Sequence, residues 1–135
     1  MTAHTFKRGR FYTRREIHQQ LGGGLRDSLP HRDGRVVCGA FTPDRNPEAP
    51  RVVLIGGARL DRWAEVLVRQ AEAVPIFLKR SPRKWEYVGD YRVGRKTRER
   101  AAIVRHAPSS IDPDPDLVLF LRRSGERGRR KRSRP

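Results

Sequence analysis

The chain has 135 residues, enough for one domain with a modest core, and it carries a net charge of +16. It contains no long apolar run and no apolar leader, so we expect a cytoplasmic protein without a membrane span. Because Cys38 is the single cysteine, an internal disulfide and a thiolate metal cluster are excluded.

The positive charge is spread along the chain and is not confined to its end. Residues 122–135 hold eight Lys or Arg and one Glu, but the residues before them are basic as well. A basic body predicts a partner with many negative charges, most simply nucleic acid. The alternative is a soluble protein that is merely rich in arginine.

The N-terminal part of the chain predicts a basic arm and a short helix. Residues 1–10 are polar and basic, which is typical of an arm. In "TRRE", Thr13 and Glu16 fit a capping box, which predicts a helix over residues 14–21. Gly22 would end this helix as its C-cap. One glycine is sufficient for a cap, so the two glycines that follow require another explanation.

The middle and C-terminal parts predict strands and one further helix. Residues 61–73 carry apolar side chains at helical spacing and predict an amphipathic helix. The three prolines of residues 42–50 predict a rigid loop, and "SPRK" predicts a hairpin turn. Runs rich in β-branched and aromatic residues predict strands over 35–41, 51–57, 74–80, 85–93, 100–106 and 117–123.

These elements indicate the fold class. Strands and helices do not alternate strictly, which disfavours a doubly wound parallel sheet. The prediction is an α+β fold, a small curved antiparallel β-barrel with two helices packed outside. The domain would span residues 11–123, followed by a disordered basic tail over residues 124–135.

Motifs for catalysis are missing from the sequence. There is no phosphate-binding GxxxxGK[ST] loop, no dinucleotide fingerprint after a strand, and no HExxH or CxxC. We therefore expect no catalytic residues, no metal and no cofactor. Asp112, Asp114 and Asp116 leave a metal-dependent nuclease open as an alternative, but the prolines between them favour a rigid solvated loop.

Aromatic residues lie among the basic ones at two places. Tyr12 lies beside Arg14, and the strand that contains Trp85, Tyr87 and Tyr91 lies beside further Lys and Arg. Aromatic faces stack on bases and guanidinium groups pair with phosphates, so this pattern is typical of nucleic-acid binding. The three strand aromatics share a face, which leaves core packing equally open for Trp85 and Tyr91.

Five segments, taken in order, resemble a known family. They are "YTRREIHQQLGG", "GRVVCGAF", "NPEAPRVVLIGG", "VPIFLKR" and "WEYVGDYRV". Together they resemble the SRA-like, PUA-like DNA-binding module of bacterial restriction proteins, which is often fused to an HNH nuclease. The resemblance covers residues 10–122. It implies a non-catalytic module that binds duplex DNA and flips a modified cytosine out of the helix. No HNH segment follows residue 122, so we expect either a stand-alone reader or a partner that is a separate nuclease subunit.

The resemblance suggests roles for particular residues. Tyr12 or Tyr87 would stack on the base beside Trp85, and Asp90 would accept a hydrogen bond from the cytosine amino group. The backbone of Gly22, Gly23 and Gly24 would approach a phosphate or the flipped nucleotide, although a flexible surface loop is the alternative. Phosphate contacts are expected from Thr13, Arg14, Arg15, Arg26, Lys79, Arg80 and Lys84, with Arg26 also able to fill the gap that a flipped base leaves.

The sequence leaves two further functions open. A PUA-like RNA-binding protein would use the same type of barrel, and the sequence does not separate the two nucleic acids. A protein-interaction domain that uses the helix around Trp63 would bind its partner with little salt dependence.

Overall fold

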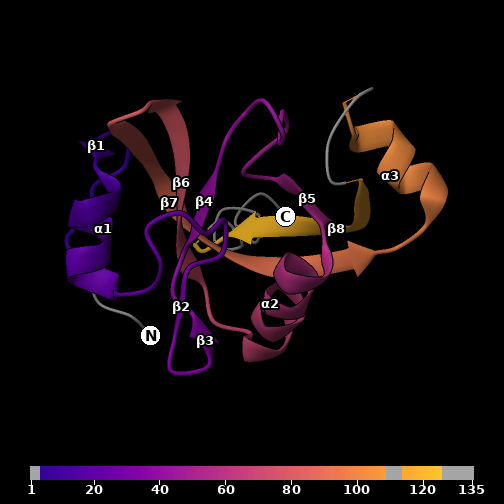
Figure 1. Cartoon of the computed structure of the whole chain (residues 1–135), viewed down its shortest axis with the longest axis horizontal. Coiled ribbons are helices and arrows are strands. Elements are labelled where there is room, and N and C mark those ends of the chain that lie inside the picture. Colours follow the sequence, from indigo (N-terminus) through magenta and orange to yellow (C-terminus); the bar gives the residue numbers. More distant parts are fainter. Residues whose placement is uncertain (1–3, 109–113, 126–135) are drawn as a thin grey trace, which may run out of the picture.

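A mixed β-sheet forms the centre of the computed structural model, which describes residues 4–108 and 114–125. Its strand order is β4-β6-β7-β8-β5, and β1 pairs with β7 outside this path (Figure 1). A separate two-stranded ladder joins β2 to β3. The strands are β1 (Phe11–Tyr12), β2 (His31–Arg32), β3 (Arg35–Val36), β4 (Gly39–Phe41), β5 (Val52–Gly56), β6 (Val74–Ser81), β7 (Lys84–Thr97) and β8 (Pro115–Arg123).

The sheet differs in two respects from the expected antiparallel barrel. The β4–β6 pair is parallel, because the chain passes through β5 and a helix before β6 runs alongside β4 in the same direction. No ladder joins β4 to β5 among the described residues, so the sheet is open there. The α+β class is confirmed, while the purely antiparallel arrangement is wrong.

Two helices lie where the sequence predicts them. Helix α1 (Arg14–Leu21) begins with the expected capping box: the Thr13 hydroxyl accepts from the Glu16 amide, and the Glu16 carboxylate accepts from the Thr13 amide. Helix α2 (Ala58–Gln70) is the amphipathic helix predicted over residues 61–73, and it begins and ends three residues earlier than predicted. The described part of the chain contains no helix with the length and apolar character that a membrane crossing requires.

Helix α3 (Arg100–His106) lies where a strand was predicted, and that prediction is wrong. Neighbouring Ile103 and Val104 suggest a strand, but only Ile103 is buried, whereas Val104 is 63% exposed. Two alanines precede them and favour a helix.

The predicted strand 35–41 is also interrupted, because the Val37 amide donates to the Pro30 carbonyl between β3 and β4.

The two faces of the sheet hold separate parts of the core. Helix α2 covers one face, where Ile55, Leu67, Ile76 and Leu119 are buried together. On the opposite face, α1 and the N-terminal residues cover one cluster and α3 covers another. Alternate residues of a strand point to opposite faces, so Val118 joins the α3 cluster while its neighbour Leu119 joins the α2 cluster.

Residues 4–10 of the expected arm pack against the body of the domain. Phe6 is buried, and its ring contacts Phe77 and Tyr12 at centroid distances of 5.0 and 4.8 Å. The His4 imidazole donates to the Asp90 carboxylate at 3.0 Å. The remaining part of the predicted tail, residues 126–135, lies outside the described residues.

Candidate nucleic-acid interface

A cavity of ≈ 380 Å³ lies between the glycine-rich loop and the beginning of α2. The loop after α1 forms one wall, and the glycines that end β5 together with the first two turns of α2 form the other. Its lining residues are Arg26, Asp27, Ser28, Leu29, His31, Gly56, Gly57, Ala58, Arg59, Leu60 and Trp63.

A stacked pair of aromatic rings lines this cavity. The His31 and Trp63 rings are 3.6 Å apart at an interplanar angle of 11°. Both side chains are only partly buried, and the Arg62 guanidinium lies 5.7 Å from the centroid of the Trp63 ring. The cavity therefore offers flat aromatic surface of the kind on which a base stacks.

Asp27 supplies the carboxylate of the cavity. Its side chain is 29% exposed and forms an ion pair with Arg59, which also lines the cavity, at 3.6 Å. The Arg14 guanidinium holds the glycine-rich loop in place by donating hydrogen bonds to the backbone carbonyls of Asp27 (2.9 Å) and Gly24 (3.2 Å). Arg14 also lies over the Trp85 ring at 4.9 Å, and burial lowers its pKa below the ordinary value.

The three glycines allow this loop to fold closely on itself. Gly22 donates its amide to the His18 carbonyl and ends α1. Gly23 has a φ of 85°, and a Cβ there would lie 2.8 Å from the Pro30 side chain. A Cβ on Gly24 would collide with the Asp27 carboxylate. Close packing within the loop thus explains the glycine run, while contact of its amides with a phosphate stays a prediction.

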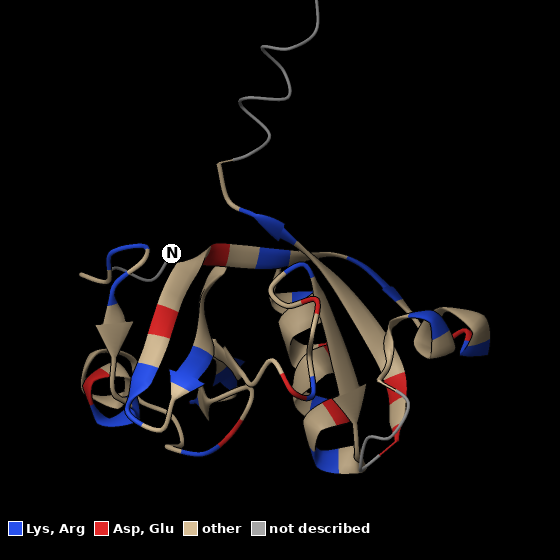
Figure 2. Ribbon diagram, turned by 90° about the horizontal axis from the view of Figure 1, so that it is seen from above, with Lys and Arg blue, Asp and Glu red and all other residues tan. Residues whose placement is uncertain are grey.

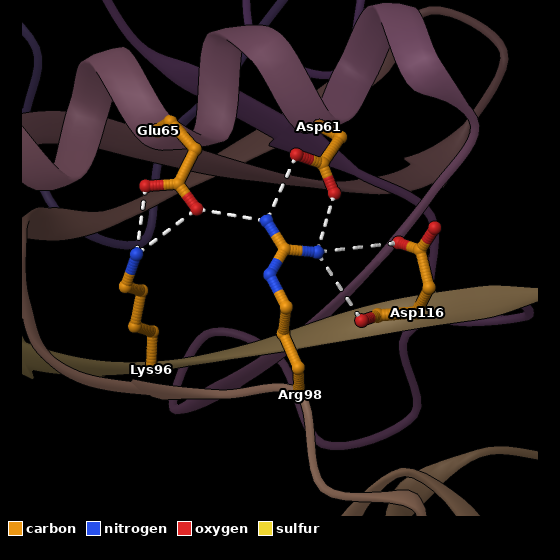
Figure 3. A network of polar contacts seen from close by, with 5 residues as sticks. All are labelled: Asp61, Glu65, Lys96, Arg98 and Asp116. Atoms are coloured by element: carbon orange, nitrogen blue, oxygen red, sulfur yellow. Dashed lines mark hydrogen bonds and ion pairs between the residues drawn. The ribbon is translucent and has the colours of Figure 1, made fainter.

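A network of charged side chains holds α2 against the sheet (Figure 3). Arg98 donates to both carboxylate oxygens of Asp61, at 2.8 and 3.0 Å, and to Glu65 at 2.8 Å. Glu65 also accepts from Lys96, and Asp116 approaches Arg98 at 4.0 Å. Hydrogen bonds from Arg98 lower the pKa of Asp61 below its ordinary value. Since Asp61 lies in the first turn of α2, the network fixes the cavity wall.

The residues predicted to form the base pocket lie elsewhere, in the α1 part of the core. Trp85 and Tyr87 are each 6% exposed, so neither presents a free face to a base. Core packing, which the sequence left open for Trp85 and Tyr91, describes all three strand aromatics. The Tyr12 hydroxyl accepts from the Lys7 amide at 2.9 Å, which ties Tyr12 to the N-terminal segment.

Asp90 is joined to this cluster and not to the cavity. Its carboxylate accepts from the Tyr87 hydroxyl at 2.7 Å and from His4 at 3.0 Å. Burial and the bonded carboxylate raise the pKa of Tyr87 above its ordinary value. The carboxylate thus already has two donors in this conformation.

The residues predicted to contact phosphate are not gathered in one place. Arg26 lines the cavity, whereas Thr13 caps α1 and Arg14 supports the loop. Arg15 is exposed on α1. The other three belong to the β6–β7 hairpin: Lys79 lies over Trp85 at 5.8 Å, Lys84 lies over Phe11 at 5.5 Å, and Arg80 pairs with Glu86 at 2.8 Å.

Most residues of the cavity give no signal in the sequence. The helical spacing treats Trp63 as a core position of its helix, and His31, Asp27 and Arg59 carry no recognisable motif. The double glycine that precedes the helix in "LIGGARLDRW" is the available signal, because it separates a buried strand from a helix by a bare backbone.

The acidic residues considered for a nuclease do not form a metal site in the described part of the chain. Asp114 and Asp116 are exposed, and Asp112 lies outside the described residues. Within residues 4–108 and 114–125, no group of three or more His, Cys, Asp or Glu side chains is arranged to hold a metal ion.

Comparison with solved structures defines the class of fold. The SRA domain of SUVH5, solved as a complex with hemimethylated CG DNA, matches this chain with a TM-score of 0.61 and 11% sequence identity. The match covers 93% of this chain and 92% of that chain. The protein therefore has an SRA-like fold, as the sequence resemblance implied.

Comparison with family models then places the chain in a family. Residues 11–105 match the family described as Domain of unknown function (DUF6697), and the chain belongs to that family. A comparison with curated proteins gives no match.

Proposed function

We propose that the protein is a DNA-binding module that reads a modified base in duplex DNA, and that the cavity beside α2 receives the flipped base. The observation that carries this proposal is the cavity itself, whose lining combines a stacked aromatic pair, a carboxylate and two arginines. The SRA-like fold supports it, since the matching SUVH5 domain was solved with hemimethylated DNA.

The lining of the cavity fits a cytosine in particular. The Asp27 carboxylate is an acceptor for the cytosine amino group, and the Trp63 ring provides a stacking surface. Leu29 and Leu60 give the cavity apolar walls next to which a methyl group would lie. Extruding a base costs a few kcal/mol, and stacking contributes about 1–3 kcal/mol per base, so the cavity can offset the cost. Methylated or hydroxymethylated cytosine is the proposed target.

The glycine-rich loop has a second role in this proposal. Leu25 is 46% exposed although it is apolar, and it directly precedes Arg26 at the cavity. Proteins that open a base step insert apolar side chains into the stack, and arginines neutralise the neighbouring phosphates. Leu25 would occupy the space that the flipped base leaves, with Arg26 on the backbone. Cleavage by a separate nuclease subunit stays a prediction.

The test compares the affinity for one duplex in plain, 5-methylcytosine and 5-hydroxymethylcytosine forms. We expect the wild type to prefer one modified form, and Trp63→Ala to reduce that preference by about 5- to 150-fold, which corresponds to one stacking interaction. Asp27→Asn tests the carboxylate with less risk to folding. Arg26→Gln should weaken binding to all three duplexes alike.

Phe11→Ala is the matched control, because Phe11 is an aromatic residue that is 50% exposed outside the cavity. It should leave the preference unchanged. Equal affinity of the wild type for the three duplexes, or loss of preference in Phe11→Ala but not in Trp63→Ala, would contradict the assignment. Competition with a structured RNA of equal length separates DNA binding from the RNA-binding alternative.

A further inference from the structure

Two arginines stand directly opposite each other on neighbouring strands. Arg92 of β7 and Arg122 of β8 are register partners in the antiparallel ladder. Like charges in such a position destabilise a sheet. Arg95 lies farther along β7, where its guanidinium stacks over Phe120 at 4.2 Å. Among the described residues, neither Arg92 nor Arg122 has an acidic side chain as a hydrogen-bond or ion-pair partner.

These arginines lie on the face of the sheet that α2 does not cover. Tyr91 and Leu121, which precede them, pack into the α2 cluster, so the side chains of Arg92 and Arg122 point the opposite way. In Figure 2 the basic segments of β7 and of the end of β8 run along the upper edge of the ribbon, and α2 lies below them. The cavity that includes Trp63 lies on the α2 side. The two basic regions are therefore on opposite sides of the sheet.

A hollow of ≈ 250 Å³ adjoins the arginine pair where β6 begins and β8 ends. Its two acidic lining residues already have partners: Asp90 accepts from Tyr87 and His4, and Glu72 forms an ion pair with Arg35. The hollow is lined by Ala71, Glu72, Ala73, Asp90, Arg92, Arg122, Arg123, Ser124 and Gly125. Its uncompensated charge is positive and comes from two paired strands, which matches a phosphodiester backbone.

We infer that this arginine face, formed by Arg92, Arg95 and Arg122, binds the phosphate backbone of a second DNA duplex. Because the cavity lies on the opposite side of the sheet, one molecule would hold two duplexes at once. Arginines without base-reading neighbours give binding that does not depend on sequence or modification. The inference goes beyond the proposed base reading and does not require it, because the second duplex is recognised by charge alone.

A bridging assay with the full chain tests this inference. A biotinylated duplex that contains 5-methylcytosine is immobilised and saturated with protein, and retention of a fluorescent plain duplex is then measured. The variant Arg92→Gln/Arg122→Gln should lower the retention of the second duplex by about tenfold or more, since two phosphate contacts are lost. Its affinity for a single immobilised duplex should remain near the wild-type value, and its Tm should not fall, because a like-charge pair has been removed.

Arg69→Gln/Arg83→Gln is the matched control, with the same loss of net charge at two exposed positions elsewhere. It should retain the second duplex as the wild type does. Retention unchanged in the Arg92/Arg122 variant, or lost equally in the control, overturns the inference. The single variant Arg122→Gln, at an exposed position near the end of β8, replaces the double variant if that does not fold. If the protein binds the immobilised duplex equally well with and without 5-methylcytosine, that result contradicts only the proposed base reading.

Discussion

Cys38 lies in the core cluster beneath α1 and has no exposed surface. Burial removes the stabilisation that water gives to a thiolate, and it raises the pKa of the thiol to about 12. Cys38 is therefore a small buried residue of the core. A thiol of this kind packs well and reacts slowly.

We expect Cys38 to make the stability of the fold depend on pH in the alkaline range. The folded pKa is raised, so the neutral thiol stabilises the native state below the pKa of the unfolded chain, and this contribution is lost as the pH rises toward 12. Between about pH 8 and 11, the Tm of the wild type should therefore fall more than the Tm of Cys38→Ala. Parallel curves for the two proteins would show that the thiol titrates normally.

At the scale of elements, the glycine-rich loop is shaped by its contacts with the β2–β3 ladder. Gly23 combines a positive φ with a close approach to Pro30 and Val37. Gly34 in the β2–β3 turn has a φ of 78°, but a Cβ added there would meet no atom within 4 Å. The two positions share the backbone strain that an L side chain would suffer, but only Gly23 is also crowded.

Alanine substitutions at these two glycines separate strain from crowding. Gly34→Ala should lower the free energy of unfolding by about 1–2 kcal/mol, the cost of a left-handed residue. Gly23→Ala should cost about 1–3 kcal/mol more, since the loop must shift away from Pro30. Urea denaturation measures both values. Equal losses at the two sites would mean that the loop adapts freely and that its packing does not require glycine.

Helix α2 is attached to the strands by the charged network around Arg98 (Figure 3). Arg98 is 48% exposed, so solvent screens each pair and its contribution to stability should not exceed about 1 kcal/mol. The pKa of Asp61 is lowered by Arg98, so this stabilisation is present above the unfolded pKa of the carboxyl and is lost on acidification.

The variant Arg98→Gln should consequently be less stable than the wild type at about pH 7 and should approach it at about pH 3. The difference in the free energy of unfolding, measured in urea at the two pH values, tests this expectation. Lys96→Gln serves as the comparison, because it removes the ion pair with Glu65 but leaves Asp61 paired with Arg98. An equal difference at both pH values would exclude the network as its source.

For the whole molecule, the net charge of +16 dominates any encounter with DNA. Binding through phosphate contacts releases counterions, and roughly six contacts lower the affinity about 10³-fold between 50 and 200 mM salt. We expect the affinity for plain duplex to fall on this scale. The ratio of affinities for modified and plain duplex should change much less, because the proposed base contacts in the cavity would release no counterions.

Titrations of both duplexes at several salt concentrations measure these two quantities together. A preference for modified DNA that disappears in parallel with the affinity would indicate that it arises from the backbone and not from a base cavity.

Much of the architecture could be predicted because it depends on local pattern. The capping box of Thr13 and Glu16 requires only neighbours in sequence, and α1 begins and ends as predicted. The apolar strands β5, β6 and β8 are recognisable from their composition. The segment of α3 was assigned wrongly because its burial depends on how one residue, Ile103, meets β5 and β8.

By itself, the sequence determined the α+β class, the basic character of the chain, the first helix with its cap, and the resemblance to an SRA-like module. Only the tertiary structure decided which aromatics are buried and which surround a cavity. Trp85 and Tyr87 alternate with polar residues just as exposed strand aromatics would, yet α1 and Phe6 cover them. His31, Asp27 and Trp63 come from separate segments and meet only because the loop folds over the start of α2, since a cavity is a property of packing between elements and not of any one of them.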